Sequence, residues 1–247
     1  MQLLVSVRAA AEVEAALLGG ADIVDAKEPS RGSMGVVSPA VLADILGQIP
    51  IDRPVSIALG DVTSPDGVLE ALSGLPRSGR QAYTYLKLGF AGVPSPERVR
   101  ALVETARLHS RRHLPLSRIV AVAYADAVPA GGADPLFICR AAATAGAAGL
   151  LIDTYVKDGR NLFTWIQPAR LAALVARARA EGLLVAVAGG LGPEDLRNVI
   201  GAKPDIVGVR GAACIGGREG RLCSSRVQQL RCMLNDLASG PLQEAVY

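Results

Sequence analysis

Metal-binding and redox motifs are missing from this sequence, because histidine and cysteine are both scarce. The two histidines, His109 and His113, are four residues apart, and no third ligand accompanies them. A zinc site ordinarily needs three or four such ligands, so we expect no metal, and we expect no other cofactor. The four cysteines form no C-x-x-C pair, and we interpret them as reduced thiols of a cytoplasmic protein. They are Cys139, Cys214, Cys223 and Cys232.

The chain also lacks the charge and the apolar segments that nucleic-acid and membrane binding require. Its 26 basic and 23 acidic residues leave a net charge of only +3, and aromatic residues make up 4%. A weak field and few stacking side chains argue against nucleic acid as a partner. No apolar run is long enough to span a membrane, and Arg8, Glu12 and Glu14 interrupt the apolar N-terminus, so we expect no signal peptide. Small molecules are the expected partners, and a homo-oligomer is compatible with this composition.

Lysine is rare relative to arginine, since it occupies only positions 27, 87, 157 and 203 among the 26 basic residues. Arginine carries surface charge equally well, but its guanidinium stays protonated and cannot perform amine chemistry. Lys27, Lys87 and Lys157 stand at or just after the ends of predicted strands, whereas Lys203 precedes one. The pattern indicates that three lysines share a chemical task and that Lys203 lies on the opposite, structural face.

Apolar, β-branched segments alternate with helical segments along the whole chain. Helix starts such as Ser38-Pro39 and Ser95-Pro96 place a capping serine before a proline at the first helical position. We predict strands at 2–7, 22–27, 54–59, 83–88, 119–124, 149–153, 183–188 and 205–209. We predict helices at 9–18, 39–46, 65–72, 96–109, 135–145, 168–181, from 193 and at 225–237. This alternation favours an α/β fold, a single (β/α)8 TIM barrel over 1–237 with a C-terminal tail at 238–247; an open doubly wound sheet is the alternative.

The segment Gly19–Gly35, GGADIVDAKEPSRGSMG, is the centre of the predicted site. Residues two apart in a strand face the same way, so Asp25 and Lys27 are expected to point together into the barrel. They stand at the carboxyl end of the strand, where barrel enzymes do their chemistry. A lysine beside a carboxylate there is a candidate amine nucleophile. A buried structural ion pair is the alternative.

Further charged residues are expected to converge on this segment. Interior layers of a barrel are filled from alternate strands, so Lys27, Lys87 and Asp153, from the second, fourth and sixth strands, are predicted to share one layer. An amine must be neutral to attack a carbonyl, and a second ammonium nearby favours the neutral form. The other lysine can then move protons. A charge cluster that merely fills the barrel is the alternative.

The loops after the seventh and eighth strands predict a phosphate site. They read Gly189-Gly190-Leu191-Gly192, before a helix start, and Arg210-Gly211. Small residues expose backbone N–H groups that bind anions, and barrel enzymes often bind phosphate at this place. We assign Gly189, Gly190, Arg210, Gly211 and, after the fifth strand, Asp126 to substrate and phosphate binding; ordinary turns are the alternative for the glycines. Segment 216–221 is interpreted as a flap that adds arginine charge.

Several motifs resemble those of one known family. They are GGADIVDAK at 19–27, GSMG at 32–35, KLG at 87–89, YADA at 124–127, DTYVKDG at 153–159 and DIVGVRGAAC at 205–214. From Met1 to about Leu237 the chain resembles the (5-formylfuran-3-yl)methyl phosphate synthase family of methanofuran biosynthesis, also called 4-(hydroxymethyl)-2-furancarboxaldehyde-phosphate synthase. The resemblance implies a (β/α)8 barrel that condenses two molecules of glyceraldehyde 3-phosphate into the furan aldehyde phosphate, with loss of phosphate and water.

The same resemblance implies roles for individual residues. Lys27 would form a Schiff base with the substrate, and Lys87 would accept a proton. Asp25, Asp153 and Lys157 would support the reaction. The chain would then be a carbon–oxygen lyase acting on phosphates, in one-carbon metabolism.

Two other functions remain open at this point. One is a Schiff-base aldolase or isomerase that acts on a small sugar phosphate on the same barrel. The other is a non-catalytic phosphate-binding barrel, against which three lysines at strand ends argue. A metal-dependent aldolase is disfavoured because histidine ligands are missing.

Overall fold

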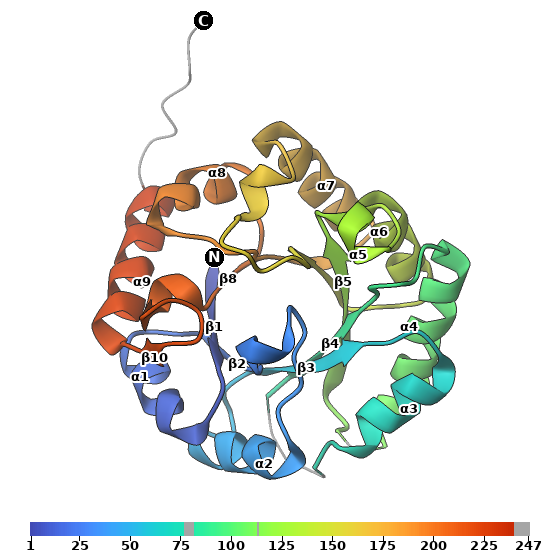
Figure 1. Cartoon of the computed structure of the whole chain (residues 1–247), viewed down its shortest axis with the longest axis horizontal. Coiled ribbons are helices and arrows are strands. Elements are labelled where there is room, and N and C mark those ends of the chain that lie inside the picture. The colour runs from blue at the N-terminus through green and yellow to red at the C-terminus, as the bar shows by residue number, and fades with distance from the viewer. Residues whose placement is uncertain (77–81, 113, 240–247) are drawn as a thin grey trace, which may run out of the picture.

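Eight parallel strands close into one barrel, in which β1 pairs with both β2 and β8. The computed structural model describes residues 1–76, 82–112 and 114–239. Helices surround the ring of strands on all sides (Figure 1). The closed ring confirms the predicted (β/α)8 barrel and excludes an open sheet. The strands are β1 (Gln2–Val7), β2 (Ile23–Ala26), β3 (Val55–Asp61), β4 (Thr84–Gly89), β5 (Ser117–Tyr124), β6 (Gly149–Asp153), β7 (Leu184–Val187) and β8 (Ile206–Val209).

The helices begin where the sequence places a cap followed by proline. The hydroxyls of Ser38, Ser64 and Ser95 accept the backbone N–H three residues later, at 3.3, 3.1 and 3.2 Å. Proline at the first helical position loses no hydrogen bond, since that N–H has no intrahelical acceptor. The main helices are α1 (Val13–Leu18), α2 (Pro39–Gln48), α3 (Pro65–Ser73), α4 (Pro96–Ser110), α6 (Pro135–Thr144), α7 (Pro168–Ala180), α8 (Leu196–Gly201) and α9 (Ser224–Ser239).

The structure differs from the predicted elements in short segments. The helix predicted at 9–18 begins as a 3-10 turn, Ala10–Glu12, before α1. The sequence pattern does not predict α5 (Ala127–Ala130) or the hairpin of β9 (Cys214–Ile215) and β10 (Arg221–Leu222), because such short elements leave no periodicity. Helix α9 continues past the expected domain boundary at 237 to Ser239. The rest of the predicted tail, 240–247, lies outside the described residues.

The apolar core has two parts, separated by the wall of the barrel. One part packs the outward faces of the strands against the helices. The other fills the barrel interior with side chains that include Leu4, Ile23, Tyr85 and Leu151. Strand residues alternate between the two faces. The interior positions two residues further along the same strands are therefore Ser6, Asp25, Lys87 and Asp153, so the apolar interior becomes polar toward the carboxyl ends of the strands.

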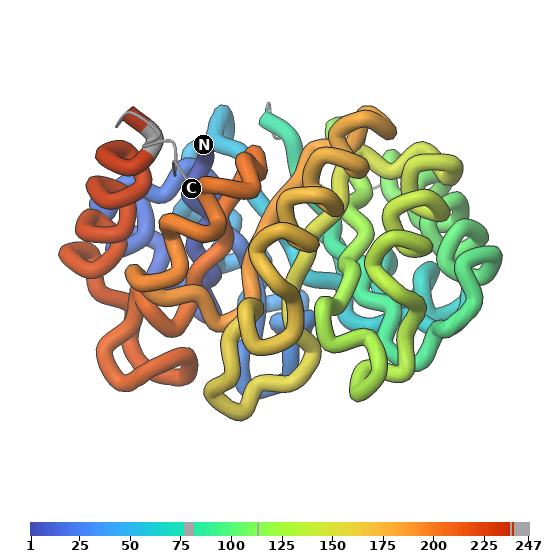
Figure 2. The backbone as a smooth tube through the Cα atoms, turned by 90° about the horizontal axis from the view of Figure 1, so that it is seen from above, coloured from blue at the N-terminus to red at the C-terminus, as the bar shows by residue number. Residues whose placement is uncertain are grey.

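The loops at the carboxyl ends of the strands gather on one face of the molecule. In Figure 2 the β9–β10 hairpin, the yellow loop after β6 and the green segment of α5 extend to the same side, away from the N-terminus. In the described part of the chain, no helix combines the length and the apolarity needed to cross a lipid bilayer. All four cysteines are free thiols, and Cys139 and Cys214 are buried.

Candidate active site

A cavity of about 800 Å³ opens at the carboxyl ends of the strands. Its apolar lining comes from the barrel interior and includes Leu4, Val120 and Ile206. All five residues predicted to be catalytic line it as well: Asp25, Lys27, Lys87, Asp153 and Lys157. The structure therefore brings together charged groups from β2, β4, β6 and the loop after β6.

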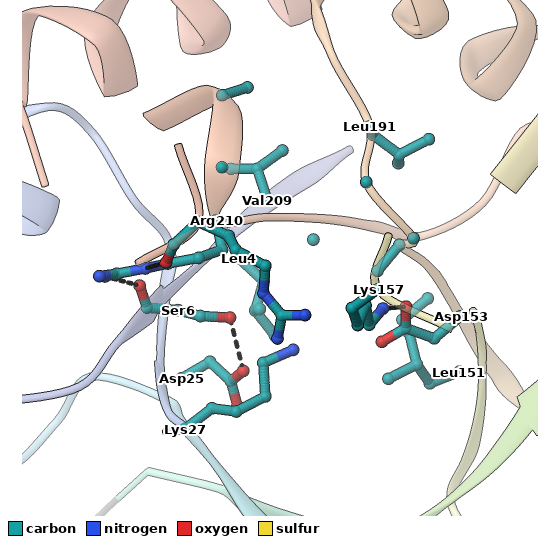
Figure 3. Close-up of a pocket in the computed structure, with 18 of the residues that line it drawn as sticks. Leu4, Ser6, Asp25, Lys27, Leu151, Asp153, Lys157, Leu191, Val209 and Arg210 are labelled. Carbon is teal, nitrogen blue, oxygen red and sulfur yellow. Dashed lines mark hydrogen bonds and ion pairs between the residues drawn. The ribbon is translucent and has the colours of Figure 1, made fainter. Parts of the chain in front are cut away.

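Asp25 and Lys87 form a buried ion pair in one wall of the cavity. The Lys87 Nζ atom lies 2.6 Å from Oδ1 and 2.7 Å from Oδ2 of Asp25. The Ser6 hydroxyl donates a hydrogen bond of 2.9 Å to the same Oδ2 (Figure 3). The carboxylate of Asp25 is thus paired with the lysine two strands away, and not with Lys27.

The charges of this pair depend on burial and on Lys27. Burial lowers the pKa of Lys87, and Lys27 lowers it further, while Asp25 opposes the change. Burial alone would raise the pKa of Asp25, but Lys87 and Lys27 outweigh it and the net pKa is lowered. Asp25 is therefore a carboxylate at neutral pH, and Lys87 releases its proton more readily than a free lysine does.

Asp153 and Lys157 form a second pair on the opposite side of the cavity. The Lys157 Nζ atom donates to Asp153 Oδ1 at 2.8 Å and to Thr154 Oγ1 at 3.0 Å. The Thr154 backbone N–H donates to the same carboxylate oxygen at 2.7 Å, and the Ser33 hydroxyl lies 3.4 Å from the other oxygen. Burial would raise the pKa of Asp153, but Lys157 and Lys27 lower it to about 2. Burial also lowers the pKa of Lys157.

Lys27 stands between these two pairs. Figure 3 shows its amine pointing into the open space between Asp25 and the Asp153–Lys157 pair. Its charge acts on both carboxylates and on both other lysines. Across the described residues no hydrogen bond or ion pair holds this amine, whereas Lys87 and Lys157 are each tied to an aspartate. Lys27 is therefore the cavity lysine that is free to meet a substrate.

Glycine-rich backbone lines the cavity after β7 and β8. Gly189 and Gly190 have φ values of +115° and +65°, which favour glycine. The carbonyl of Gly189 accepts the Leu162 N–H at 2.7 Å, and Asp195 accepts the Gly192 N–H at 2.9 Å, so the loop is fixed at both ends. Within the described chain, the N–H groups of Gly189, Gly190 and Leu191 have no acceptor. Gly211 lines the same cavity, and phosphate binding by these loops stays a prediction.

Arg210 does not have the free guanidinium that a phosphate ligand needs. Its two Nη atoms donate to Glu12 at 2.5 and 3.0 Å, in a buried, forked ion pair. The same guanidinium donates to the carbonyls of Ser6, Arg218 and Gly220, at 3.0, 2.9 and 2.9 Å. In Figure 3 the side chain extends away from Lys27 and Asp153. These five donated bonds argue against the predicted role of Arg210 in phosphate binding, and they tie the end of β8 to β1 and to the β9–β10 hairpin.

Asp126 also has a different role from the predicted one, because both its oxygens bind backbone. Oδ1 accepts the Tyr155 N–H at 2.6 Å and Oδ2 accepts the Val156 N–H at 2.8 Å. The side chain is buried and is not part of the cavity wall. Asp126 therefore fixes the loop that carries Lys157, and these two bonds argue against its predicted role in phosphate binding.

Comparison with known proteins identifies the family. The sequence model described as 4-HFC-P synthase matches residues 3–231. The chain belongs to the 4-HFC-P synthase family. It is 37% identical over 239 residues to the (5-formylfuran-3-yl)methyl phosphate synthase of Methanothermobacter thermautotrophicus. The matched region covers 95% of this chain and 99% of that protein. It is 38% identical over 221 residues to the protein of the same name from Methanopyrus kandleri, covering 89% and 92%.

Solved structures of low sequence identity share the fold of this 4-HFC-P synthase family member. Phosphoribosyl anthranilate isomerase from Thermus thermophilus has a TM-score of 0.60 at 15% identity, covering 96% of this chain and 100% of that one. KGPDC from Streptococcus mutans has a TM-score of 0.62 at 13% identity, covering 96% and 98%. At such identities the likeness establishes the fold alone.

The sequence pattern does not single out several residues that build the site of this family member. Ser33 belongs to the GSMG motif, but only the folded loop brings it near Asp153. Glu12 carries no local signal, because its partner Arg210 is 198 residues away. Among the described residues, no group of three His, Cys, Asp or Glu side chains is arranged to hold a metal ion. His113, one of the two histidines considered above, lies outside the described residues.

The charged state of Asp153 is expected to stabilise the fold above acid pH. The pKa of Asp153 falls from 3.8 to about 2 on folding. The ionised carboxylate therefore contributes fully to the free energy of unfolding above pH 3.8, and this contribution is lost as the pH falls to 2. The shift corresponds to about 2 kcal/mol. Urea unfolding should show the stability difference between wild type and Asp153→Asn shrinking by that amount between pH 5 and 2. The exposed Asp44→Asn variant should keep the wild-type acid profile; a constant difference for Asp153→Asn would contradict the interpretation.

Proposed function

We propose that this member of the 4-HFC-P synthase family condenses two molecules of glyceraldehyde 3-phosphate to (5-formylfuran-3-yl)methyl phosphate through a Schiff base on Lys27. The observation that carries the proposal is the free Lys27 amine between two lysine–aspartate pairs. The names of its relatives supply the product. The reaction would belong to methanofuran biosynthesis and would be that of a carbon–oxygen lyase.

The two pairs fit the proton transfers that such a condensation requires. Lys27 would attack the aldehyde carbon of one triose phosphate, and loss of water would give an imine that withdraws electrons from the adjacent carbon. Lys87, whose pKa is lowered by burial, would first release its ammonium proton to solvent and would then, as a neutral amine, remove the proton from that carbon. The electron pair would then expel the phosphate group from the next carbon by β-elimination. Lys157 would protonate oxygen leaving groups, and Asp153 would hold it in place.

The remaining steps balance the atoms of two trioses against one furan. The second triose phosphate forms the new carbon–carbon bond, and ring closure and dehydration follow. Two triose phosphates lose one phosphate and two waters overall, and the imine water is returned when the product leaves Lys27. Aromaticity of the furan makes the last step irreversible. The N–H groups of the loop at Gly189 and Gly190 would bind the phosphate of the triose that forms the imine, until that phosphate is expelled.

Borohydride trapping with product analysis tests this proposal. Purified protein and glyceraldehyde 3-phosphate should give the ultraviolet absorbance of a furan aldehyde. Borohydride added during turnover should fix a triose adduct on the peptide that contains Lys27. The Lys203→Arg variant is the matched control, because Lys203 is the one lysine outside the cavity, and it should behave as wild type. An adduct on Lys87 or Lys157 would overturn the assignment of Lys27, and an imine without furan would favour an aldolase or isomerase.

A further inference from the structure

The proposed reaction brings two phosphate groups into one cavity, and the glycine loop accounts for one of them. The second needs a cation whose charge is not already matched. Among the cavity cations, Lys87, Lys157 and Arg210 are paired with Asp25, Asp153 and Glu12. Arg160, at the rim, pairs with Asp158. That leaves Lys27 and Arg218, which have no carboxylate partner in the described part of the chain.

Arg218 lies on the turn of the β9–β10 hairpin and lines the cavity. Its Nη2 atom donates to two neutral acceptors in the loop after β2, the carbonyls of Pro29 at 2.7 Å and Gly32 at 3.1 Å. Its Nε and Nη1 atoms donate to nothing within the described chain. The guanidinium is half-buried, and burial lowers its pKa while the charges of Asp153 and Glu219 oppose the change. Part of the fork is thus anchored, and the rest is available to an anion.

The hairpin turn is held in place by the Glu12–Arg210 ion pair. Arg210 Nε donates to the carbonyl of Arg218 itself, and Arg210 Nη2 donates to the carbonyl of Gly220. Both distances are 2.9 Å, and the guanidinium that makes them is buried. A buried ion pair therefore fixes the turn backbone on both sides of Glu219, at Arg218 and at Gly220. Such preorganisation lowers the entropy that the arginine loses when it binds a ligand.

We propose that Arg218 binds the phosphate of the second triose phosphate, the one that does not form the imine. The cavity then has two chemically different phosphate sites: neutral backbone N–H groups at Gly189 and Gly190, and a charged guanidinium on the hairpin. A guanidinium fork matches two phosphate oxygens. The inference rests on the proposed function, since it needs two phosphorylated substrates.

The reduced adduct on Lys27 separates the two sites in an experiment. Borohydride fixes the first triose phosphate on Lys27, so its phosphate fills one site and leaves the second one open. Glycerol 3-phosphate is then titrated calorimetrically into this trapped protein. We expect one binding site in trapped wild type, and binding weaker by about 10- to 100-fold in trapped Arg218→Gln, because a charged, forked hydrogen bond is lost. Arg218→Lys should recover part of the loss, and Arg221→Gln, on the same hairpin but outside the cavity, should bind as wild type.

Each outcome bears on a different claim. Equal binding to trapped wild type and trapped Arg218→Gln would overturn the second phosphate site. Weaker trapping of the first triose on Lys27 in Arg218→Gln would also overturn it, because the arginine would then serve the imine-forming substrate. Absence of any adduct in wild type would instead contradict the proposed function. Normal trapping of Arg218→Gln, with furan formation reduced at least tenfold, would support the inference.

Discussion

Replacing Lys27 with arginine is expected to reduce furan formation by a factor on the order of 10⁴ or more, as removal of a covalent nucleophile does. Arginine keeps the positive charge between the two aspartate–lysine pairs, but its guanidinium cannot become a neutral amine. No hydrogen bond or ion pair of Lys27 within the described chain is lost. The free energy of unfolding should therefore change little, and the measurement is steady-state furan absorbance alongside urea unfolding.

Lys203→Arg provides the control for this substitution. The same chemical change is made there on the far side of the barrel, and activity should be unchanged. Borohydride should fix no triose on Lys27→Arg, including at Lys87 and Lys157, since both amines are held as ion pairs. Substantial turnover by Lys27→Arg would exclude imine chemistry at this position.

Replacing Glu12 with glutamine is expected to lower the free energy of unfolding by about 3–5 kcal/mol, the usual cost of leaving one member of a buried pair alone. Glu12 and Arg210 have side chains only 11% and 7% exposed, and the carboxylate receives both Nη atoms of the guanidinium. Glutamine keeps the shape and one acceptor oxygen but removes the negative charge. Urea unfolding at neutral pH measures the loss.

An exposed pair on α4 is the matched control. The Arg100 Nε atom lies 4.0 Å from Glu104 Oε1, and about half of each side chain is exposed. Glu104→Gln should therefore change stability by less than about 0.5 kcal/mol. Combining Glu12→Gln with Arg210→Met should restore part of the loss, because no unpaired charge is then buried. A loss below about 1 kcal/mol in Glu12→Gln alone would show that water or another group compensates Arg210.

The barrel could be predicted from sequence because its signals are local. Capping residues followed by proline mark the helix starts, and apolar β-branched runs mark the strands, so the predicted and observed strands nearly coincide. The site could be predicted in part for the same reason. Alternation along a strand places Asp25 and Lys27 on one face, and scarcity of lysine draws attention to Lys87 and Lys157. Each of these inferences needs only neighbours within a few residues.

The roles of Arg210 and Asp126 could not be predicted, because they depend on partners distant in sequence. Both residues stand after strands, where a residue that binds phosphate is expected, but both hold loops in place. The guanidinium of Arg210 donates its hydrogen bonds to Glu12 and to the hairpin carbonyls. The carboxylate of Asp126 accepts hydrogen bonds from two backbone N–H groups of the loop after β6. A strand-end position indicates that a polar residue faces the site, but it does not indicate which group becomes the hydrogen-bond or ion-pair partner of that residue.

The sequence by itself determined the order of strands and helices, the face of each strand and the identity of the three cavity lysines, because periodicity and capping act between near neighbours. Only the tertiary structure decided which lysine is free. Closing the barrel brings Lys87 to Asp25, 62 residues away, and the loop after β6 brings Lys157 to Asp153. Both aspartates are thereby occupied, and Lys27 is left without a partner in the described chain. Pairing between charges follows distance in space, and distance in space is set by the closed sheet.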